Sequence, residues 1–516
     1  MPLLARLVLG AAAGAALALA FEPFAFVLLL PVAVAAVSLL VTGLTPGRGF
    51  VVGTGFGTTF MLVLLPWLQV IGADAWAALS LLEGLFYGLM AAAATLVQRM
   101  RWWPVWVAAL WVGTEALRGT VPFGGFPWGR LAFATADTPL AALVGYVGTA
   151  GTSFVVALLG CLLAWVALAV RRTPLPAAGV LAASCGLVAA AALLPAVVPV
   201  DVAQESRTVR VAAVQGDVPG EGMEAFAERR AVLDNHVEVT HELAQQVASG
   251  TEAPDLVIWP ENSTDIDPFS DPTVHADIQG AVDAIGAPVL VGAMVSGEEP
   301  GDVFNQGIVW TPGEGPGQTY SKTHPVPFGE YIPFRDVFAR FITRLEQIPR
   351  DMVPGTEPGV LDMAGTTIGD VICFEVAYDA VVRDVVTGGA ELLVVQTNNA
   401  TYMGTGQIEQ QFAISRLRAI ETGRYVVVAA TNGVSGIIAP DGEVAERAPV
   451  RSRAVLLRDL PVLDVTTPAI RWGRWVELLL VLVAAVSVSG AFAVDRRRRR
   501  QEQGRSDAAR GTALSR

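Results

Sequence analysis

The chain has 516 residues, of which 53% are hydrophobic and only 16% are charged, and its mean hydropathy is +0.50. These values exclude an ordinary soluble protein and indicate a membrane protein that is long enough for several domains. The formal net charge of −13 belongs to the middle of the chain, because the C-terminal tail is rich in arginine, and an acidic central region argues against nucleic acid as a partner.

Long apolar stretches dominate the first 200 residues. A helix that crosses a bilayer needs about 20 apolar residues, and seven stretches before residue 200 approach or exceed this length, followed by an eighth near the C-terminus. The eight stretches are Leu3–Ala20, Phe24–Thr42, Phe50–Ile71, Ala75–Val97, Pro104–Leu117, Leu140–Val170, Ala177–Val198 and Trp475–Val494. We therefore expect a multi-pass helical membrane domain over residues 1–200 and one more membrane helix within residues 471–494.

Arginines predict the orientation of these helices. If eight helices alternate across the membrane, most arginines outside the central region fall on the same side as both termini. That side receives Arg6, Arg48, Arg99, Arg101, Arg171, Arg172 and the terminal arginine cluster, whereas the other side receives chiefly Arg118 and Arg130. Since cytoplasmic loops carry the excess of Lys and Arg, we expect a protein of the cell membrane with both termini in the cytoplasm and the central region outside it.

Two acids and one loop stand out within the membrane region. Glu83 lies inside an apolar stretch, where an acid marks either a functional group or a helix-packing contact. Glu115 precedes a loop rich in aromatic residues and glycine, residues 122–130, which contains Trp128 and Arg130. This loop is typical either of an interfacial aromatic belt or of a segment that lines a substrate site.

From residue 201 onward, short apolar strands alternate with amphipathic stretches. The predicted strands are Val209–Val214, Leu256–Trp259, Val289–Gly292, Ile308–Trp310, Ile368–Cys373, Leu392–Gln396, Val426–Ala430 and Gly436–Ala439, and the predicted helices are Met223–Val247 and Gln407–Thr422. This alternation predicts an α/β layered domain over residues 201–470. The basic tail, residues 495–516, has too few apolar side chains for a core, so we expect it to be disordered and cytoplasmic.

One strand of this domain delivers a cysteine, Cys373, to its end, with Glu375 two residues further along. Open α/β sheets place their chemistry at the carboxyl ends of strands, so the pattern suggests a nucleophile. The alternative is a small buried side chain in a core strand.

Two further segments place an ionisable group at a strand end or in a loop rich in Gly and Pro. Glu261 follows the predicted strand Leu256–Trp259, and Lys322 is followed eight residues later by Glu330. A thiol is mostly protonated near neutral pH, so a nucleophilic Cys373 needs a base, which Glu261 can supply, and a cation, which Lys322 can supply. Each residue alone is also typical of an exposed position, but the set together indicates catalysis.

The motifs around these residues resemble those of the nitrilase, or carbon-nitrogen hydrolase, superfamily. With helices before and after them, the chain resembles the membrane-embedded apolipoprotein N-acyltransferase family over about residues 1–490. The motifs that carry the resemblance are Trp259-Pro-Glu261-Asn, Lys322-Thr-His-Pro-Val-Pro-Phe-Gly-Glu330-Tyr, Ile372-Cys373-Phe-Glu375, Val214-Gln-Gly216, Gly125-Phe-Pro-Trp128, Arg416-Leu-Arg-Ala-Ile-Glu421 and Thr431-Asn-Gly433. The resemblance implies an α-β-β-α sandwich that carries a Glu-Lys-Cys triad.

The same resemblance implies an acyl transfer in two steps. Cys373 would take a fatty acyl chain from a phospholipid as a thioester, and the α-amino group of a lipoprotein's diacylglyceryl-modified first cysteine would then receive it. Glu261 carries over as the general base and Lys322 as the stabiliser of the oxyanion. Four supporting positions also carry over: Glu330 and Glu375, which orient Lys322 or position the amine, Asn305 near the site, and Phe374, whose backbone N–H serves an oxyanion hole. The loop Asn398-Asn-Ala-Thr401 departs from the family pattern, so no role is carried over to it.

Two other functions remain open at this stage. One is a membrane-tethered amidase or nitrilase that hydrolyses a small amide, and the other is a non-catalytic scaffold or transporter in which the membrane helices are the active part. His236, His241, His275 and His324 lack partners at metal-ligand spacing, so we predict no metal, and we predict no other cofactor. We expect a monomer whose partners are membrane lipids, a phospholipid acyl donor and apolipoproteins.

Overall fold

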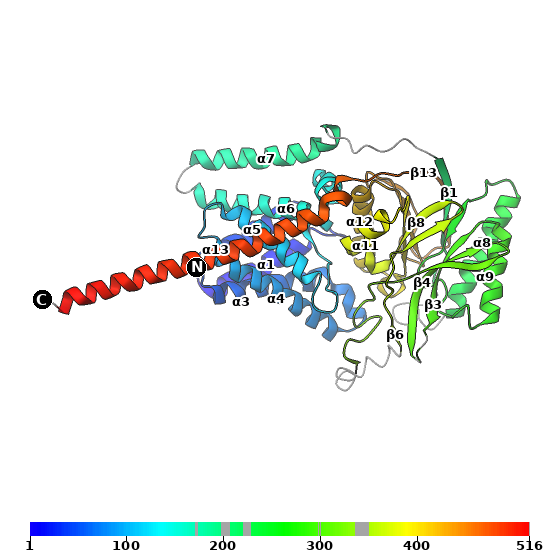
Figure 1. Cartoon of the computed structure of the whole chain (residues 1–516), viewed down its shortest axis with the longest axis horizontal. Coiled ribbons are helices and arrows are strands. Elements are labelled where there is room, and N and C mark those ends of the chain that lie inside the picture. Colours follow the sequence, from blue (N-terminus) through cyan, green and yellow to red (C-terminus); the bar gives the residue numbers. More distant parts are fainter. Residues whose placement is uncertain are drawn as a thin grey trace.

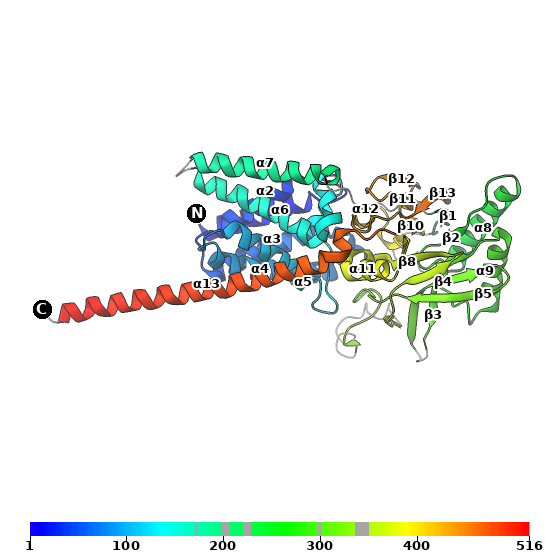
Figure 2. The ribbon, with the colours of Figure 1, turned by 45° about the horizontal axis from the view of Figure 1, so that its top comes forward.

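A computed structural model describes residues 1–170, 174–197, 207–219, 229–297, 299, 301–335 and 350–514. A helical bundle lies at one end of the molecule and an α/β domain at the other (Figure 1). The N-terminus and the end of the last helix lie on the side of the bundle away from the α/β domain in both ribbon views (Figures 1 and 2).

Each of the eight predicted apolar stretches contains a helix. The helices are α1 (Leu3–Ala18), α2 (Leu29–Val41), α3 (Pro46–Leu64), α4 (Ala73–Val97), α5 (Trp103–Arg118), α6 (Val144–Ala169), α7 (Pro174–Val197) and α13 (Pro468–Leu514). Four spans are long and apolar enough to cross a membrane by length and composition: Pro46–Leu64, Ala73–Val97, Pro139–Ala169 and Pro468–Arg496. The count of eight membrane helices is therefore approximate, although the helical nature of the region is confirmed.

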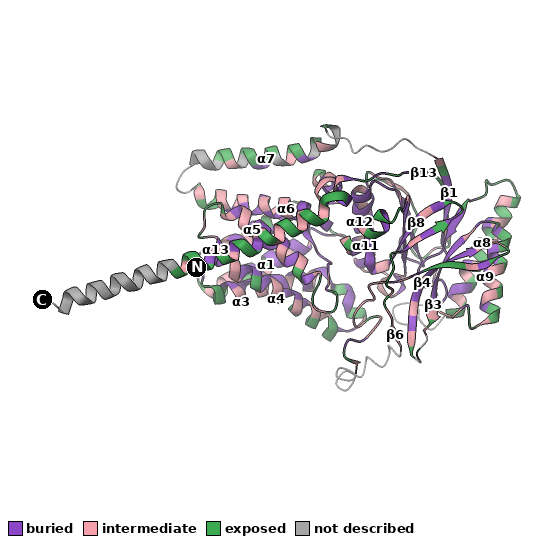
Figure 3. Cartoon of the chain, viewed as in Figure 1, coloured by how far each residue is buried: buried purple, intermediate pink, exposed green. Residues whose placement is uncertain are grey.

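Small residues allow the bundle helices to approach closely. A Cβ added to Gly53 of α3 would lie 2.3 Å from the Cβ of Ala91 of α4, so only a glycine fits at this crossing. The outer surface of the bundle is apolar along α13, where green segments of the ribbon in Figure 3 mark exposed residues. Several of these residues have large apolar side chains. They are Trp472, Trp475, Leu478, Leu479, Leu482 and Val486. An exposed apolar face of this kind suits contact with lipid.

The C-terminal tail differs from the prediction. We expected disorder over residues 495–516, yet α13 continues as one helix to Leu514. Arginine, glutamine, glutamate and alanine are good helix formers, and a helix that is already nucleated in the membrane extends at little further cost.

Two β-sheets face one another in the α/β domain. The first contains β1 (Arg207–Gln215), β2 (Leu256–Ile258), β3 (Val289–Ser296), β4 (Asp302–Thr311), β5 (Gly315–Ser321), β6 (Asp351–Met352) and β13 (Ala454–Val462), in the order β13-β1-β2-β3-β4-β5 with β6 beside β4. The second contains β7 (Val360–Met363), β8 (Thr366–Ile372), β9 (Leu392–Thr397), β10 (Val426–Ala430), β11 (Gly436–Ile438) and β12 (Val444–Arg447), in the order β12-β11-β10-β9-β8-β7. The strands β1, β2 and β3 run parallel, as do β8, β9 and β10.

Helices cover the outer face of each sheet. Apolar side chains of α8 (Arg229–Ala248) and α9 (Pro272–Ile285) pack on the first sheet, and those of α11 (Asp379–Thr387) and α12 (Gln407–Thr422) pack on the second. A third apolar cluster fills the space between the sheets. The expected α-β-β-α sandwich is thus confirmed. The helix predicted over Met223–Val247 begins at Arg229 in the described part of the chain, and residues 220–228 lie outside it.

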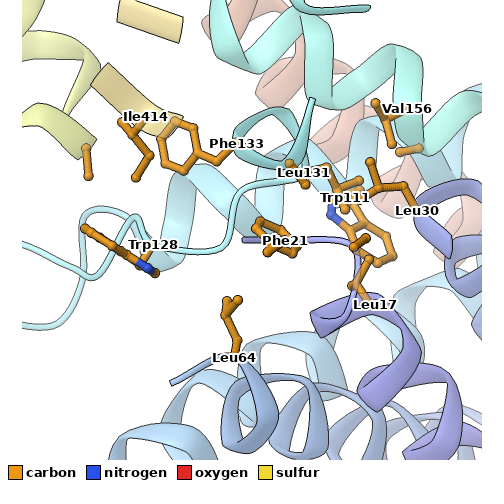
Figure 4. Close-up of a cluster of buried hydrophobic side chains, with 14 of the residues drawn as sticks. Leu17, Phe21, Leu30, Leu64, Trp111, Trp128, Leu131, Phe133, Val156 and Ile414 are labelled. Carbon is orange, nitrogen blue, oxygen red and sulfur yellow. The ribbon is translucent and has the colours of Figure 1, made fainter. Parts of the chain in front are cut away.

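The helix layer of the second sheet also packs on the membrane bundle. One continuous apolar cluster runs from the membrane helices into α11 and α12. Figure 4 shows Ile414 of α12 beside Phe133, which follows the loop after α5. Ion pairs cross the same boundary: Arg130 lies 2.6 Å from Asp379, the first residue of α11. The two parts of the molecule are therefore joined by apolar and ionic contacts close to strand β8.

Candidate active site

Strand ends of the two facing sheets supply the predicted catalytic residues. Glu261 lies three residues beyond the end of β2 in the first sheet, and Cys373 directly follows β8 in the second. The backbone of Cys373 has φ +54°, in the left-handed region that non-glycine residues rarely adopt, and a short 3₁₀ helix, η6 (Cys373–Ala377), begins there. This sharp turn presents the thiol at the edge of the sheet.

Both carboxyl oxygens of Glu261 have partners. Asn305 donates to Oε1 at 2.7 Å, Lys322 Nζ donates to the same oxygen at 3.1 Å, and the backbone N–H of Asn398 donates to Oε2 at 2.8 Å. Glu261 is 3% exposed, so these contacts replace the water that would otherwise solvate it. Asn305 therefore contacts the proposed base directly.

Lys322 connects two acids. Its Nζ lies 2.6 Å from Glu330 Oε1 as well as 3.1 Å from Glu261 Oε1, and Glu330 is held in turn by the backbone N–H of Val326 at 2.8 Å. Burial alone would lower the pKa of Lys322, but the carboxylates of Glu261 and Glu330 outweigh burial and raise that pKa well above its usual value. The side chain is thus a buried ammonium ion, and Glu330 orients it.

Lys322 is also the single lysine of the chain, in which the other permanently charged basic residues are arginines. A lysine carries a compact charge, whereas the guanidinium of arginine is planar and larger. In a chain that uses arginine everywhere else, a lysine at this position indicates that the site needs an ammonium group.

The thiol of Cys373 is partly exposed and accepts a hydrogen bond from Thr397 Oγ1 at 3.4 Å. Burial of the sulfur among protein atoms, followed by the charge of Glu261, raises the pKa of Cys373 to about 12, although Lys322 and Thr397 act in the opposite direction. The resting group is therefore a neutral thiol. A nucleophile of this kind must lose its proton to a base as it attacks.

This protonation state leads to a measurable prediction. In a variant with Cys161→Ala and Cys185→Ala, the alkylation of Cys373 by iodoacetamide should become about tenfold faster per unit of pH between about pH 7 and 9, because the thiolate fraction grows in that proportion below the pKa. Mass spectrometry of the alkylated peptide gives the rate. A plateau in the rate below pH 8 would mean a preformed thiolate and would contradict this assignment.

Glu375 does not contact Lys322. It is fully buried, and its carboxylate accepts hydrogen bonds from Tyr320 Oη at 2.9 and 2.8 Å and from the backbone N–H groups of Thr323 at 2.7 Å, His324 at 3.0 Å and Ile372 at 2.9 Å. Glu375 thereby ties the end of β8 to the segment that carries Lys322. This carboxylate holds the backbone of the site in place.

The aromatic ring of Phe374 lies against the membrane bundle. It stacks between Phe126, with ring centroids 5.5 Å apart, and Trp128, with centroids 5.6 Å apart and planes only 9° from parallel. Trp128 donates in turn to Gln410 of α12 at 2.8 Å. The residue next to the nucleophile thus packs on the 122–130 loop, which favours a position of that loop at the site over a simple aromatic belt.

Glu83 and Glu115 support the same loop. Glu83 pairs with Arg118 at 3.1 Å, and Arg118 donates to the carbonyl of Phe126 at 2.8 Å. Glu115 accepts from Trp111 at 3.2 Å and from the backbone N–H of Leu131 at 2.8 Å. Glu83, through Arg118, therefore anchors the middle of the loop, and Glu115 anchors the residue directly after it.

Sequence reasoning missed the contribution of the last residue of β9 and of the segment that follows it. Thr397 contacts the thiol, the backbone of Asn398 contacts Glu261, and the Asn399 amide donates to Gln407 at 3.0 Å and to Gln411 at 2.9 Å. The available signal was its position directly after a buried parallel strand, since that is where strand β8 also delivers Cys373.

Comparisons with known proteins identify the family of the chain. Residues 13–162 match the family model of the apolipoprotein N-acyltransferase N-terminal domain, and residues 210–467 match that of carbon-nitrogen hydrolases. The chain is 40% identical over 484 residues to the apolipoprotein N-acyltransferase of Mycolicibacterium smegmatis, covering 89% of this chain and 81% of that protein. It is 30% identical over 522 residues to the one of Methylococcus capsulatus, covering 95% and 97%. Among solved structures, a mutant amidase of the nitrilase superfamily from Nesterenkonia AN1 aligns with 50% of this chain and 93% of its own, with a TM-score of 0.37 and 17% identity.

Proposed function

The chain belongs to the apolipoprotein N-acyltransferase family, and from this membership we propose that Cys373 carries an acyl group between a phospholipid and a lipoprotein. The protein is a membrane acyltransferase of lipoprotein maturation. The observation that supports the proposed chemistry is the buried chain of charges Glu261–Lys322–Glu330, which acts electrostatically on the thiol at the end of a facing strand.

The first step forms the thioester. Glu261 takes the thiol proton while the sulfur of Cys373 attacks the ester carbonyl of the phospholipid, and the new oxyanion lies against the Lys322 ammonium and the backbone N–H of Phe374. When the tetrahedral intermediate collapses, the C–O bond breaks. The lysophospholipid alkoxide leaves with the proton held by Glu261.

The second step forms the amide. The free α-amine of a diacylglyceryl-modified cysteine attacks the thioester carbonyl, and Glu261 accepts a proton from the nitrogen. The Lys322 ammonium again stabilises the oxyanion. The C–S bond then breaks, and the thiol of Cys373 is restored with the proton from Glu261. No group beyond these residues is needed for the proton balance.

Aromatic contacts support a lipid route to the site. Phe123 of the 122–130 loop lies with its ring centroid 6.0 Å from those of Phe328 and Phe334, and Tyr331 Oη donates to the Phe123 carbonyl at 3.4 Å. Phe334 is 70% exposed, an unusual position for a phenylalanine unless it meets lipid. The structure describes this segment to residue 335, and residues 336–349 lie outside the described residues.

We assign residues 1–200 and 471–494 to the membrane and residues 201–470 to a catalytic domain outside the cytoplasm. The arginine distribution supports this orientation, as does the position of both chain ends away from the α/β domain, although Arg171 and Arg172 lie outside the described residues. A single copy brings all the proposed catalytic residues together, which supports a monomer.

A sequential transfer experiment tests the proposal. Purified protein in phospholipid vesicles with a labelled acyl chain is separated from free lipid and then given a short peptide with an S-diacylglyceryl N-terminal cysteine. We expect the label to stay on the protein until the peptide is added and then to move to its amine. The matched control is the same peptide with an acetylated N-terminus, which should leave the label on the protein. Label released as free fatty acid in both cases would favour a hydrolase instead.

A further inference from the structure

A further carboxyl group near the nucleophile, that of Asp370, has no role in the mechanism described above. It sits in β8, three residues before Cys373, on the face that Ile368 and Ile372 present to the apolar layer between the sheets. The residue is 0% exposed. Among the residues that the structure describes, no side chain donates a hydrogen bond to either carboxyl oxygen of Asp370 and none of the ion pairs involves it, and the backbone N–H of the next residue, Val371, is the donor that acts on its charge.

Two neighbouring side-chain amides also have an oxygen that accepts no hydrogen bond from the described residues. Gln396 uses its NH₂ group to donate to the Trp259 carbonyl at 2.6 Å, and its Oε1 has no donor within the described part of the chain. Asn305 uses its NH₂ group on Glu261, and its Oδ1 likewise has no donor there. Turning either amide over would place its oxygen against another oxygen, so both orientations are fixed by these contacts. The layer therefore contains buried acceptors and too few donors.

Gly307 of β4 brings two of these acceptors together. A Cβ added to Gly307 would lie 2.1 Å from Asp370 Oδ2 and 2.9 Å from Gln396 Oε1. Both oxygens therefore border the same small space, which only glycine leaves open. Two acceptors in such a position repel one another unless one of them carries a hydrogen.

We propose that Asp370 is a positioning residue that keeps its proton in the working enzyme and donates it to Gln396 Oε1. The hydrogen bond links Asp370 through Gln396 to the Trp259 carbonyl, two residues before Glu261. Through this hydrogen bond, β8 and β9 of the second sheet hold the segment of the first sheet that carries Glu261, the proposed base. The role in catalysis rests on the function proposed above, whereas the protonation of Asp370 does not.

The charges around Asp370 agree with this assignment. Burial, followed by the negative charges of Glu375 and Glu261, raises the pKa of Asp370 well above its ordinary value. Within the described residues, Tyr320 is a further titratable group close to Asp370, and its hydroxyl donates to Glu375 and is not available to Asp370.

Infrared spectroscopy tests the protonation without any substitution. Protein labelled with [4-¹³C]aspartate is compared with unlabelled protein at about pH 8, where Asp265, whose pKa is raised to about 6, is ionised. We expect a carbonyl-stretch band of a protonated carboxyl group that shifts with the label. The band should be absent from the Asp370→Asn variant and present in Glu357→Gln, a change at an exposed acid. A labelled wild-type protein without this band would overturn the proposal, even if the variants do not fold.

Two variants test the positioning role by single-turnover acylation. Asp370→Asn keeps a donor for Gln396 and should retain the maximal rate within about threefold, whereas Asp370→Leu removes it and should lose at least about tenfold in maximal rate, with little change in the phospholipid concentration that gives half of that rate. Equal losses in both variants would contradict a role as donor. If the infrared band is present but the wild-type protein forms no acyl-enzyme, the proposed function fails and the protonation of Asp370 stands.

Discussion

Replacement of Cys373 by alanine is expected to lower N-acyl transfer by about 10⁴-fold or more, because no other group can hold the acyl chain between the two substrates. The neighbouring groups stay in place in this variant, since Glu261 is held by Asn305, Lys322 and the backbone of Asn398. The measurement is the rate of label transfer from phospholipid to the amine of the diacylglyceryl peptide.

Cys161→Ala and Cys185→Ala are the matched controls, because both cysteines belong to membrane helices, α6 and α7, and should leave the rate within about twofold. The outcome also separates an enzyme from a scaffold or transporter. A non-catalytic protein would tolerate Cys373→Ala and Glu261→Gln and would instead depend on the membrane acids Glu83 and Glu115.

Replacement of Lys322 by alanine should lower the rate of acyl-enzyme formation by about 10²-fold or more, as the loss of one oxyanion donor typically does. The substitution also leaves Glu261 and Glu330 close together without the cation between them. Single-turnover formation of the labelled acyl-enzyme measures the effect.

Lys322→Arg separates charge from shape at this position. It keeps the positive charge, but a planar guanidinium cannot occupy the space of an ammonium held 3.1 Å from Glu261 and 2.6 Å from Glu330, so we expect a loss close to that of alanine. An exposed control, Arg458→Ala, should have no effect. Normal acyl-enzyme formation in Lys322→Ala would refute the assigned role.

The strands that carry the site were predicted from sequence because they are short apolar runs that end in a functional group. The run ending at Cys373 and the run before Glu261 coincide with β8 and β2, and Gln407–Thr422 is helix α12 as expected. The apolar pattern predicts these elements because nearly all of their side chains are buried.

Other elements were missed for physical reasons. Strand β5 has the sequence Gly-Pro-Gly-Gln-Thr-Tyr-Ser and lies at the edge of its sheet, where exposed polar side chains hide the strand pattern. Strand β13 pairs with β1 although the two are more than 230 residues apart in the chain, and no local pattern encodes such a pairing. The other strands follow one another in sequence order within each sheet, so β13, and β6 beside β4, are the departures that no local pattern predicts.

The contacts between the site and distant segments of the chain could not be predicted from the sequence either. The stacking of Trp128 on Phe374 joins a membrane loop to the residue after the nucleophile, and the bond from Gln396 to Trp259 joins the two sheets. Such contacts depend on three-dimensional packing between distant segments. The motifs pointed to Glu261, Lys322 and Cys373, and also to Glu330 and Asn305, which contact Lys322 and Glu261, but not to the contacts of Thr397 and Asn398.

The central claim is that the acyl chain travels on the sulfur of Cys373, and peptide mapping after incubation with phospholipid alone tests it most directly. We expect the peptide containing Cys373 to gain the mass of one fatty acyl group, and hydroxylamine at neutral pH to remove that group as it does other thioesters. An acyl group mapped to a different residue, or an unmodified Cys373 peptide in protein that still transfers acyl chains, would contradict the account.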